Sequence, residues 1–413
     1  MNELKNRKII SSIIKFLSDH EIIILHGSRQ VGKTSILKIL MSGILKEKTP
    51  RGNIVYFDLE DFGLVELCNS GPDKVVEYLK GINCDFNNKI YLIIDEIQYL
   101  ENPSSFLKLF HDRYRETIKI IVSGSSSFEI KSKFKDSLVG RSLSFEIFTL
   151  DFEEFLLFKG EKINLEGKLP DFLNKKLLGL YKEYVLYGSY PAIVLEDSIE
   201  KKEFKLKQII NTYIRKDVRD LFDIRNINKF NSLIRILAGQ SAKLLNIYEL
   251  SNTIKIARQT IEEYILILEN TYIVKRIYPF HKNIRSELTK MPKIYFEDTG
   301  VLNILNNRTF SEIVSGELFE NSVYMNLRRS IPVEYIYFWR TNRGQKVDFI
   351  LDKGKIVPIE VKLSYRNKLM KNSLYFIDKY NTGEIYCITL KKSDSSKYGS
   401  IYQLYPWEIY KVF

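Results

Sequence analysis

The feature that most constrains this chain is a glycine-rich segment near its N-terminus. The segment Gly27-Ser-Arg-Gln-Val-Gly32-Lys33-Thr34 fits the pattern G-x-x-x-x-G-K-[ST]. It follows the strand-length apolar run Ile22–Leu25 and precedes Ser35–Leu40, which can form a helix. Glycines at such a junction let backbone N–H groups wrap phosphates at a helix N-terminus. The sequence therefore predicts a P-loop that binds a nucleoside triphosphate.

Each part of this segment has an expected role. Lys33 can reach the β and γ phosphates, and the Thr34 hydroxyl can bind Mg²⁺. The expected cofactors are therefore ATP and Mg²⁺. The residues predicted to line the nucleotide are Gly27, Ser28, Arg29, Gln30, Val31, Gly32, Lys33, Thr34 and Ser35.

A second apolar run delivers two acids that complete this site. The run Ile90–Ile94 is followed directly by Asp95 and Glu96. Ligands of open α/β sheets bind at the carboxyl ends of strands, so we expect Asp95 to hold Mg²⁺ through water. Glu96 would polarise the water that attacks the γ phosphate. The alternative is an ordinary strand end with two solvated acids.

A third candidate position follows the run Ile118–Val122. The hydroxyls of Ser123-Gly-Ser-Ser-Ser127 could orient the attacking water or detect the γ phosphate, and Ser125 is the candidate catalytic residue among them. A simple Gly/Ser turn is the alternative.

The spacing of apolar runs predicts an α/β fold for this part of the chain. Short β-branched runs alternate with amphipathic stretches, which is typical of a parallel sheet. A polar, breaker-rich stretch, Phe158–Lys176, then indicates a domain boundary. The predicted strands are Ile22–Leu25, Ile54–Leu59, Ile90–Ile94 and Ile118–Val122.

The rest of the chain contains helical and strand-like segments. Leu177–Gly239 has helical spacing, with an apolar stripe formed by Ile209, Tyr213, Val218, Leu221 and Ile224. Beyond Thr309 we predict a helix and three strands that are joined by the turns Asn342-Arg-Gly344 and Asp352-Lys-Gly354. These elements are a helix over Gly316–Arg329 and strands over Tyr335–Thr341, Lys346–Leu351 and Ile356–Leu363.

Composition bounds the class of protein. The 413 residues are 45% hydrophobic, enough for more than one core, and 63 Lys and Arg against 51 Asp and Glu give a formal charge of +12. This charge suits nucleic acid or an acidic surface. The 3 scattered cysteines form neither a disulfide framework nor a metal motif. With no membrane-span-length apolar run and no signal peptide, we expect no membrane partner and a cytoplasmic location.

A helix-turn-helix pattern lies in the middle of the chain. We expect Leu245–Thr253 as one helix, Ile254–Ile256 as the turn and Ala257–Leu268 as the second helix. The candidate DNA contacts at the start of the second helix are Arg258, Gln259 and Thr260. The alternative is a small packing module without DNA, because Glu262, Glu263 and Glu269 make the helix acidic further along.

Two neighbouring strands near the C-terminus could form a nuclease site. Alternation places Glu360 and Lys362 on one face, and Asp348 lies on the preceding strand. If pairing aligns them, two carboxylates could hold Mg²⁺ while Lys362 activates water, as in restriction-endonuclease-like folds. The alternative is a set of ordinary acid–lysine pairs across a hairpin.

Taken in order, these motifs resemble a known family. The chain is similar to AAA-type ATPases of archaea and bacteria that join an N-terminal P-loop domain to a C-terminal winged-helix and restriction-endonuclease-like part of uncertain activity. Ser189 and Lys346 depart from the pattern, where the family usually has a glycine and often has an acid. The resemblance rests on Gly27–Thr34, Asp95–Gln98, Gly124–Ser126, Gly140-Arg141, Tyr187–Pro191, Gly316 with Phe319-Glu320, Trp339–Thr341, Val347-Asp348 and Ile359–Lys362.

The resemblance implies further roles. Arg141, which follows the last core strands, is a candidate sensor or trans-acting arginine, or else a structural ion pair. Glu320 is the further acid of the nuclease-like site, and Tyr272–Pro279 with Lys293–Phe296 are the candidate wing strands. A homo-oligomer is the corresponding expectation.

The resulting fold prediction is an AAA-type P-loop NTPase parallel sheet, a helical connector, a winged helix and an α+β nuclease-like domain. The expected ranges are 1–157, 158–239, 240–300 and 301–413. We predict Mg²⁺-dependent ATP hydrolysis that drives a conformational change, with DNA as the partner; a protein partner stays open. The alternatives are an ATP-regulated, Mg²⁺-dependent DNA nuclease and a nucleotide-gated binding protein with little turnover.

Overall fold

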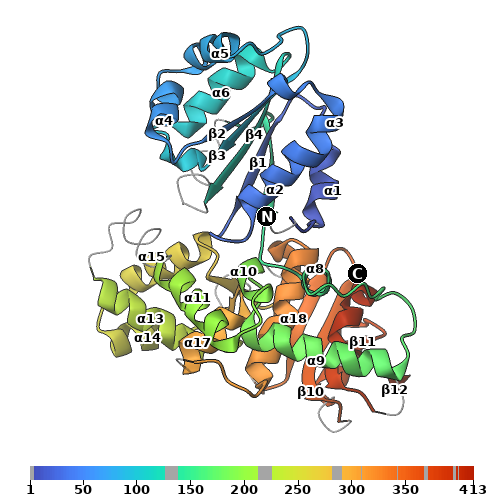
Figure 1. The fold of residues 1–413 in the computed structure, drawn as a ribbon. Helices are drawn as coiled ribbons and strands as arrows, with labels where there is room; N and C mark the ends of the chain where they lie inside the picture. Colours follow the sequence, from blue (N-terminus) through green and yellow to red (C-terminus); the bar gives the residue numbers. More distant parts are fainter. Residues whose placement is uncertain are drawn as a thin grey trace. The chain divides into compact units, whose positions relative to one another are not determined.

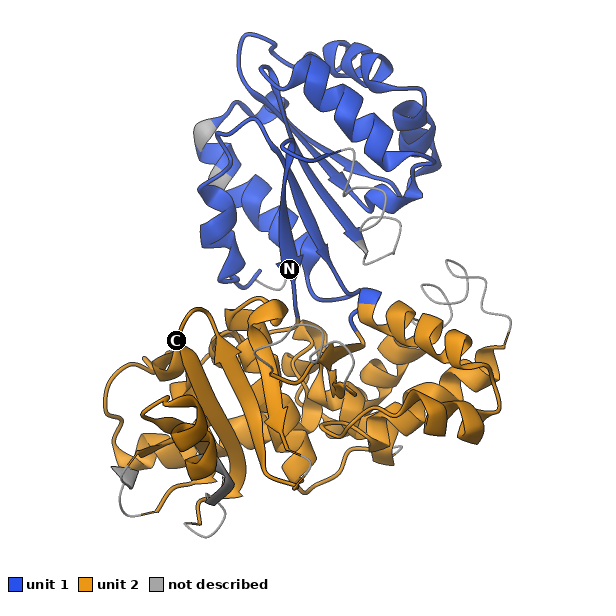
Figure 2. Cartoon of the chain, turned by 180° about the vertical axis from the view of Figure 1, so that it is seen from behind, with its two compact units in different colours: residues 1–148, 270–272 blue, residues 149–269, 273–413 orange. Residues whose placement is uncertain are grey.

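The chain divides into two compact units (Figure 2). Unit 1 comprises Met1–Phe148 with Asn270–Tyr272, and unit 2 comprises Thr149–Glu269 with Ile273–Phe413. The computed structural model describes residues 4–125, 138–212, 226–280, 291–307, 309–341, 343–366, 371–393, 397–398 and 400–413. The first boundary falls after Phe148, earlier than the sequence analysis places it.

Unit 1 contains a five-stranded sheet in the order β2-β3-β4-β1-β5, and every neighbouring pair is parallel. The predicted parallel α/β sheet is therefore confirmed. The fifth strand is not among the predicted ones, and it begins directly after Arg141. The expectation that Arg141 follows the last core strand is thus wrong. The strands are β1 (Ile22–Gly27), β2 (Ile54–Asp58), β3 (Ile90–Asp95), β4 (Ile118–Ser125) and β5 (Ser142–Ile147).

Helices cover both faces of this sheet (Figure 1). Helices α4, α5 and α6 lie on one face and α1, α2 and α3 on the other. Alternate residues of the strands, such as Ile22, Ile24, Leu92 and Ile94, enter the core beneath α4–α6. The helices are α1 (Ile9–Ile14), α2 (Lys33–Ile39), α3 (Lys46–Lys48), α4 (Phe62–Asn69), α5 (Pro72–Gly81) and α6 (Pro103–Tyr114), with the π-helical turn η1 (Leu40–Leu45) and the 3-10 turns η2 (Arg51–Asn53) and η3 (Ile97–Tyr99).

Unit 2 begins with helices. Aromatic packing explains why it begins at Thr149 and not at residue 158. The Phe152 ring lies 4.8 Å from that of Tyr181, and the Phe155 ring lies 5.5 Å from that of Tyr184. These rings attach α8 to α9, so the segment before Phe158 folds with unit 2. Of the predicted apolar stripe, Ile209 is buried on α11, and its other four positions lie outside the described residues. These helices are α8 (Phe152–Phe158), α9 (Asp171–Tyr187), α10 (Pro191–Val194) and α11 (Ile199–Thr212).

The helix-turn-helix segment has the predicted helices. Helix α14 is followed by a turn at Lys255 with φ +57° and then by α15. Strands β6 and β7, the candidate wing strands, pair antiparallel. Among all the residues that the structure describes, no helix is long and apolar enough to cross a membrane. The elements are α13 (Ile227–Gly239), α14 (Ile247–Ile254), α15 (Arg258–Asn270), β6 (Val274–Ile277), β7 (Lys293–Phe296) and α17 (Thr299–Asn307).

The last part of unit 2 is a mixed six-stranded sheet in the order β12-β13-β11-β10-β9-β8. Strands β8, β9 and β10 are antiparallel neighbours, and β10 runs parallel to β11. The predicted helix and three strands match α18, β8, β9 and β10 to within one residue at each end; the later elements were not predicted. They are α18 (Gly316–Ser330), η5 (Val333–Tyr335), β8 (Ile336–Arg340), β9 (Lys346–Asp352), β10 (Ile356–Ser364), α19 (Lys371–Tyr380), β11 (Ile385–Lys391), β12 (Lys397–Tyr398), β13 (Ile401–Leu404) and η7 (Pro406–Val412).

Candidate nucleotide site and a second polar cluster

The P-loop connects the end of β1 to the start of α2. A Cβ atom at Gly27 would lie 2.1 Å from the Ile147 carbonyl oxygen, so only glycine lets β1 and β5 approach this closely. Gly32 has a φ of +98°, a left-handed conformation that glycine adopts without strain. Helix α2 begins at Lys33, directly after this turn. The positive end of the helix dipole therefore lies at the loop, where an anion is stabilised.

Lys33 is held inside the loop. Its side chain is buried, and Nζ donates to the carbonyl oxygens of Gly27 at 3.0 Å and Ser28 at 2.9 Å. These bonds keep the ammonium group at the end of β1, within the turn that would enclose a phosphate. Of the other predicted contacts, Arg29, Gln30 and Val31 lie in the turn and Ser35 lies in the first turn of α2.

Asp95 is the hydrogen-bonding hub of unit 1. It is 2% exposed, and its Oδ2 accepts from Thr34 Oγ1 at 2.7 Å and from the Tyr56 hydroxyl at 2.9 Å. Its Oδ1 accepts from Ser123 Oγ and from the backbone N–H of Glu96. Burial and then the negative charge of Asp95 raise the pKa of Tyr56, so this phenol stays a donor. The P-loop threonine and the predicted acid of β3 are thus in direct contact.

Glu96 occupies a constrained position next to this hub. Its φ of +56° is left-handed, which costs a non-glycine residue about 1 kcal/mol or more. Gln98 Nε2 donates to Glu96 Oε2 and orients the carboxylate. Strained backbone of this kind concentrates at functional sites. The geometry gives Glu96 a fixed carboxylate at the carboxyl edge of the sheet.

The donor set at this edge suits Mg²⁺. Thr34 offers a hydroxyl oxygen and Asp95 a carboxylate, and the two groups are hydrogen-bonded to each other. Mg²⁺ prefers such hard oxygen ligands and retains several waters. The residues present therefore fit the ion that the sequence predicts.

The serines after β4 are only partly described. Ser123, rather than Ser125, donates to Asp95. Ser125 ends β4, and its side chain, like the following residues 126–137, lies outside the described part of the chain. The proposed role of Ser125 stays a prediction.

Arg7 is a residue of this site that sequence reasoning missed. It is 7% exposed; Nη1 donates to the Val31 carbonyl at 2.8 Å and Nη2 to the Phe148 carbonyl at 3.0 Å. The guanidinium thus connects the P-loop to Phe148, the last residue of the N-terminal segment of unit 1. No sequence pattern marks an arginine that lies 24 positions before its partner.

Arg141 lies at the amino-terminal end of the parallel strands, whereas the P-loop lies at their carboxyl-terminal end. Its carbonyl accepts from Ile22 N, at the start of β1, whereas the P-loop follows the end of this strand. The six residues of β1 separate the two positions by roughly 17 Å. Arg141 Nε donates to Asp112 Oδ1 at 2.7 Å, which raises the pKa of Arg141. Arg141 therefore does not reach the nucleotide of its own chain.

The candidate DNA contacts lie in the first turn of α15. Arg258 and Gln259 are exposed and Thr260 is half-buried. The Arg258 guanidinium stacks over the Tyr248 ring at 4.5 Å, and Gln259 Nε2 donates to Glu263 at 3.3 Å. The three residues therefore lie together in the first turn of α15.

The acidic character of α15 is partly compensated. Arg276 on β6 donates to Glu262 at 2.8 Å and to Glu269 at 2.7 Å. These two acids, which argued against DNA, thus have a cationic partner in the same segment. Their charge counts less against DNA binding than the sequence alone suggests.

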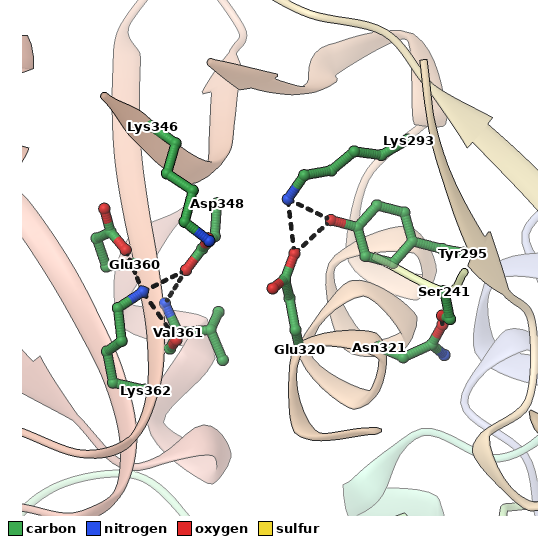
Figure 3. Close-up of polar contacts among 10 residues, drawn as sticks. All are labelled: Ser241, Lys293, Tyr295, Glu320, Asn321, Lys346, Asp348, Glu360, Val361 and Lys362. Atoms are coloured by element: carbon green, nitrogen blue, oxygen red, sulfur yellow. Dashed lines mark hydrogen bonds and ion pairs between the residues drawn. The ribbon is translucent and has the colours of Figure 1, made fainter. Parts of the chain in front are cut away.

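A second polar cluster lies in unit 2 (Figure 3), and we call it the acid–lysine cluster. It comprises Lys293, Glu320, Asp348, Glu360 and Lys362. On one side, Lys362 Nζ donates to Asp348 Oδ2 at 2.7 Å and to a Glu360 oxygen. Val361 N also donates to Asp348 Oδ2, at 3.0 Å. The predicted alignment of Asp348 with Glu360 and Lys362 is present.

On the other side, Glu320 takes its partners from β7. Lys293 Nζ lies 2.8 Å from Glu320 Oε1, and the Tyr295 hydroxyl donates to the same oxygen at 2.7 Å. Figure 3 shows the polar ends of Glu320 and Lys293 turned toward the side on which Asp348 lies. Lys293 and Tyr295 were named only as parts of a candidate wing, because the pattern of β7 gives no sign of a distant glutamate.

Burial and mutual charge shift the acids in opposite directions. Burial and then the charge of Asp348 raise the pKa of Glu360 to about 8. Burial alone would raise the pKa of Asp348, but the charges of Lys362 and Lys293 outweigh it and lower this pKa. Burial lowers the pKa of Lys293, and the charges of Glu320 and Asp348 reverse this and raise it. The pKa of each of these groups thus depends on the charges of the others in the cluster.

As placed, this cluster does not fit a divalent metal. Within the described residues, no three His, Cys, Asp or Glu side chains gather in a way that could hold one. The carboxylates of Glu320, Asp348 and Glu360 instead contact lysine ammonium groups. We therefore derive no metal-dependent step at this cluster.

Comparison with known protein families divides the chain into three matched segments. A model of an AAA domain matches residues 19–156. Models of two domains of unknown function, DUF8612 and DUF4143, match residues 178–312 and 315–410. With the parallel sheet and the Asp95 hub, the first match supports an AAA-type ATPase that binds and hydrolyses nucleotide.

Similar proteins cover nearly the whole chain. An uncharacterized protein of Methanocaldococcus jannaschii is 28% identical over 88% of this chain and 80% of its own length. An uncharacterized protein of Haemophilus influenzae is 23% identical over 93% of this chain and 94% of its own length.

Solved structures resemble the chain more weakly. AMPPCP-bound DnaA from Aquifex aeolicus has a TM-score of 0.31 and 18% identity, covering 63% of this chain and 86% of its own. Cdc6p from Pyrobaculum aerophilum has a TM-score of 0.33 and 12% identity, covering 71% and 90%.

Proposed function

We propose that this chain binds ATP with Mg²⁺ at its P-loop, hydrolyses it, and uses the resulting conformational change on DNA. The observation that carries the proposal is the 2.7 Å hydrogen bond from Thr34 Oγ1 to Asp95 Oδ2. It joins the P-loop to the acid of a second strand, and a triphosphate site needs both at one place.

The side chains divide the chemistry among themselves. Lys33 and the N-terminus of α2 bind the phosphates, and Thr34 with Asp95 would hold Mg²⁺. The ion, when bound, neutralises charge on the β and γ phosphate oxygens. Glu96 accepts hydrogen bonds from the attacking water and orients it, while Gln98 keeps its carboxylate in place.

Arg141 fits a role between chains better than one within a chain. It lies at the sheet edge opposite the P-loop, and its pair with Asp112 is at the surface. A trans-acting arginine stabilises transition-state charge on the neighbour's nucleotide, which requires a homo-oligomer.

DNA is the proposed partner for two reasons: polar side chains are exposed at the start of α15, and the chain carries a net positive charge. Arg258 and Gln259 are exposed in the first turn of α15, and the formal charge of the chain is +12. Phosphate contacts and base-edge contacts both suit these residue types.

Phosphate release under saturating Mg²⁺-ATP tests hydrolysis. Glu96→Gln should lower kcat by roughly 10²–10⁴-fold while ATP still binds. Glu101→Gln, at an exposed acid nearby, is the matched control and should match the parent. Equally slow release from the parent and from Glu96→Gln would instead favour a nucleotide-gated binding protein with little turnover.

DNA binding has its own test. Arg258→Ala should weaken DNA binding by about 1–3 kcal/mol. Arg235→Ala, at an exposed arginine of α13, is the control for a general loss of positive charge. If DNA neither binds nor stimulates ATPase activity in an oligomeric fraction, a protein partner replaces DNA in the proposal.

An ATP-regulated DNA nuclease is the alternative function. The observation for it is that Asp348 lies within 2.7 Å of Lys362, as predicted for cleavage. The lysine contacts of the three acids count against it, because they supply the charge that a metal ion would bring. The parent protein with Mg²⁺ and ATP should then cut plasmid, and Asp348→Asn should abolish cleavage while ATPase activity survives. Intact plasmid with the parent would count against this alternative.

A further inference from the structure

The Lys293 ammonium lies inside the acid–lysine cluster although its strand is outside the six-stranded sheet. Residue Lys293 begins β7, which pairs with β6, whereas Asp348 and Glu360 come from β9 and β10. Its side chain is 9% exposed and contacts Glu320 at 2.8 Å. A buried lysine pays a large desolvation cost, so such a position indicates a strong local need for a cation.

Tyr295 holds the same carboxylate from the same strand. Its hydroxyl donates to Glu320 Oε1 at 2.7 Å and lies 3.3 Å from Lys293 Nζ. Alternation along β7 puts Lys293 and Tyr295 on one face, so the strand presents a cation and a donor together. Glu320 is thereby fixed in contact with Lys293.

Asp348 supplies an independent observation. Its side chain is 1% exposed, and no hydrogen bond to Oδ1 is present in the described structure. Lys346, which is 54% exposed, forms only a long ion pair with this oxygen, at 3.6 Å. A buried carboxylate oxygen in this situation is a ready ligand for a cation.

We propose that Lys293 is the resident cation of the acid–lysine cluster, and that Glu320 and Asp348 bind a divalent metal only when this ammonium is removed. Lys293 supplies the positive charge that two carboxylates otherwise take from a metal ion. The inference goes beyond the proposed ATPase, because it concerns unit 2 alone and does not depend on nucleotide hydrolysis.

Metal binding to the full-length chain tests the proposal, with Mn²⁺ alone as the probe and no nucleotide present. Lys293→Met removes the ammonium and should tighten Mn²⁺ binding by about tenfold or more, or add a binding site, because it leaves a buried acid uncompensated. Lys293→Arg keeps the charge and should match the parent. Lys355→Met, at an exposed lysine of unit 2 that pairs with Glu384 outside the cluster, should leave the affinity unchanged.

A second substitution locates the gained site. Adding Glu320→Gln to Lys293→Met should remove the additional binding, because it removes a carboxylate ligand. Binding at Asp95 is common to all these proteins and does not affect their comparison. Lys293→Gln, which is polar and neutral, is measured in parallel and should gain Mn²⁺ binding even if the methionine variant fails to fold.

Two results would overturn the proposal. One is a parent that already binds Mn²⁺ as tightly as the lysine-free variants and loses that binding with Glu320→Gln. The other is a folded Lys293→Gln or Lys293→Met protein that gains no Mn²⁺ binding. Neither result bears on ATP hydrolysis, which is assayed separately.

Discussion

The two polar sites of this chain use lysine in opposite ways. In unit 1, Lys33 donates to the backbone carbonyls of Gly27 and Ser28, within the loop that would enclose phosphate. In unit 2, Lys362 donates to the carboxylates of Asp348 and Glu360. The first lysine is held by neutral groups, and the second is held by Asp348, an anion that neutralises it, with Glu360 beside it.

The difference indicates which site is prepared for an anionic ligand. Carbonyl oxygens orient an ammonium group without cancelling its charge, so Lys33 still attracts a triphosphate. A lysine paired with a buried, ionised carboxylate such as Asp348 has little net attraction left for phosphate. Similar residue types therefore predict function only together with the groups that position them.

The largest expected effect separates the two sites. Lys33→Ala should reduce ATP hydrolysis by roughly 10²–10³-fold, because it removes a preorganised charge from the phosphates. Lys362→Ala should leave ATP hydrolysis unchanged, since its partners are all in unit 2. Steady-state phosphate release from both variants checks this, and equal losses would end the distinction between the sites.

Removing an acid from the acid–lysine cluster should destabilise unit 2. Asp348→Asn leaves Lys362 with one carboxylate fewer in a buried position, which should cost about 3–5 kcal/mol. Denaturant unfolding followed by Trp339 and Trp407 fluorescence reports on unit 2, because both tryptophans lie there. An unchanged midpoint would mean that the ion pairs contribute nothing net.

Arg7 should affect the nucleotide site through the loop that it holds. Arg7→Met removes charged hydrogen bonds to Val31 and Phe148, worth roughly 1.5–3 kcal/mol in stability. Since Arg7 positions the loop, KM for ATP should rise more than kcat falls, and Arg7→Lys should restore part of the affinity. Arg113→Met, at an exposed pair with Asp73, is the control, and a fall in kcat alone would argue against a positioning role.

The smallest expected effect, taken per unit of pH, is a pH dependence of the stability of unit 2. Glu360 has a pKa of about 8 when folded against an ordinary value of 4.5, so the folded state binds its proton more tightly. Between these pH values the parent should lose stability as pH rises, by at most about 1.4 kcal/mol per pH unit. Glu360→Gln should lack this loss.

Unfolding free energies at several pH values check this prediction. The difference between Glu360→Gln and the parent should move in favour of the glutamine variant as pH rises from about 5 to about 8. Glu334→Gln, at an exposed acid, should follow the parent. If the unfolding free energies of all three proteins change with pH in the same way, the raised pKa of Glu360 is contradicted.

How far the sequence predicts this molecule depends on whether a feature is local. The P-loop is contiguous, so its glycines, Lys33 and Thr34 could be recognised directly. Strand β5 was missed because Ser142–Ile147 alternates polar and apolar residues without a continuous apolar run. The parallel sheet itself follows from the repeated apolar runs before it.

The missed site residues have long-range partners. Tyr56 reaches Asp95 only because β2 and β3 are neighbours, with Asp58 opposite Asp95. Arg7 and Lys293 likewise contact positions 24 and 27 residues away. Nothing in a single sequence fixes such pairings, since they depend on strand order and register. The proximity of Asp348, Glu360 and Lys362 could be predicted, because a tight turn links the two strands that carry them.

The most direct test of the account is calorimetric titration of ATP into the purified chain in magnesium buffer. The account predicts saturable binding by the parent and by Glu96→Gln, and binding that is lost or strongly weakened in Lys33→Ala. If the parent takes up no ATP or GTP, or if Lys33→Ala binds as tightly as the parent, the proposed triphosphate site is contradicted.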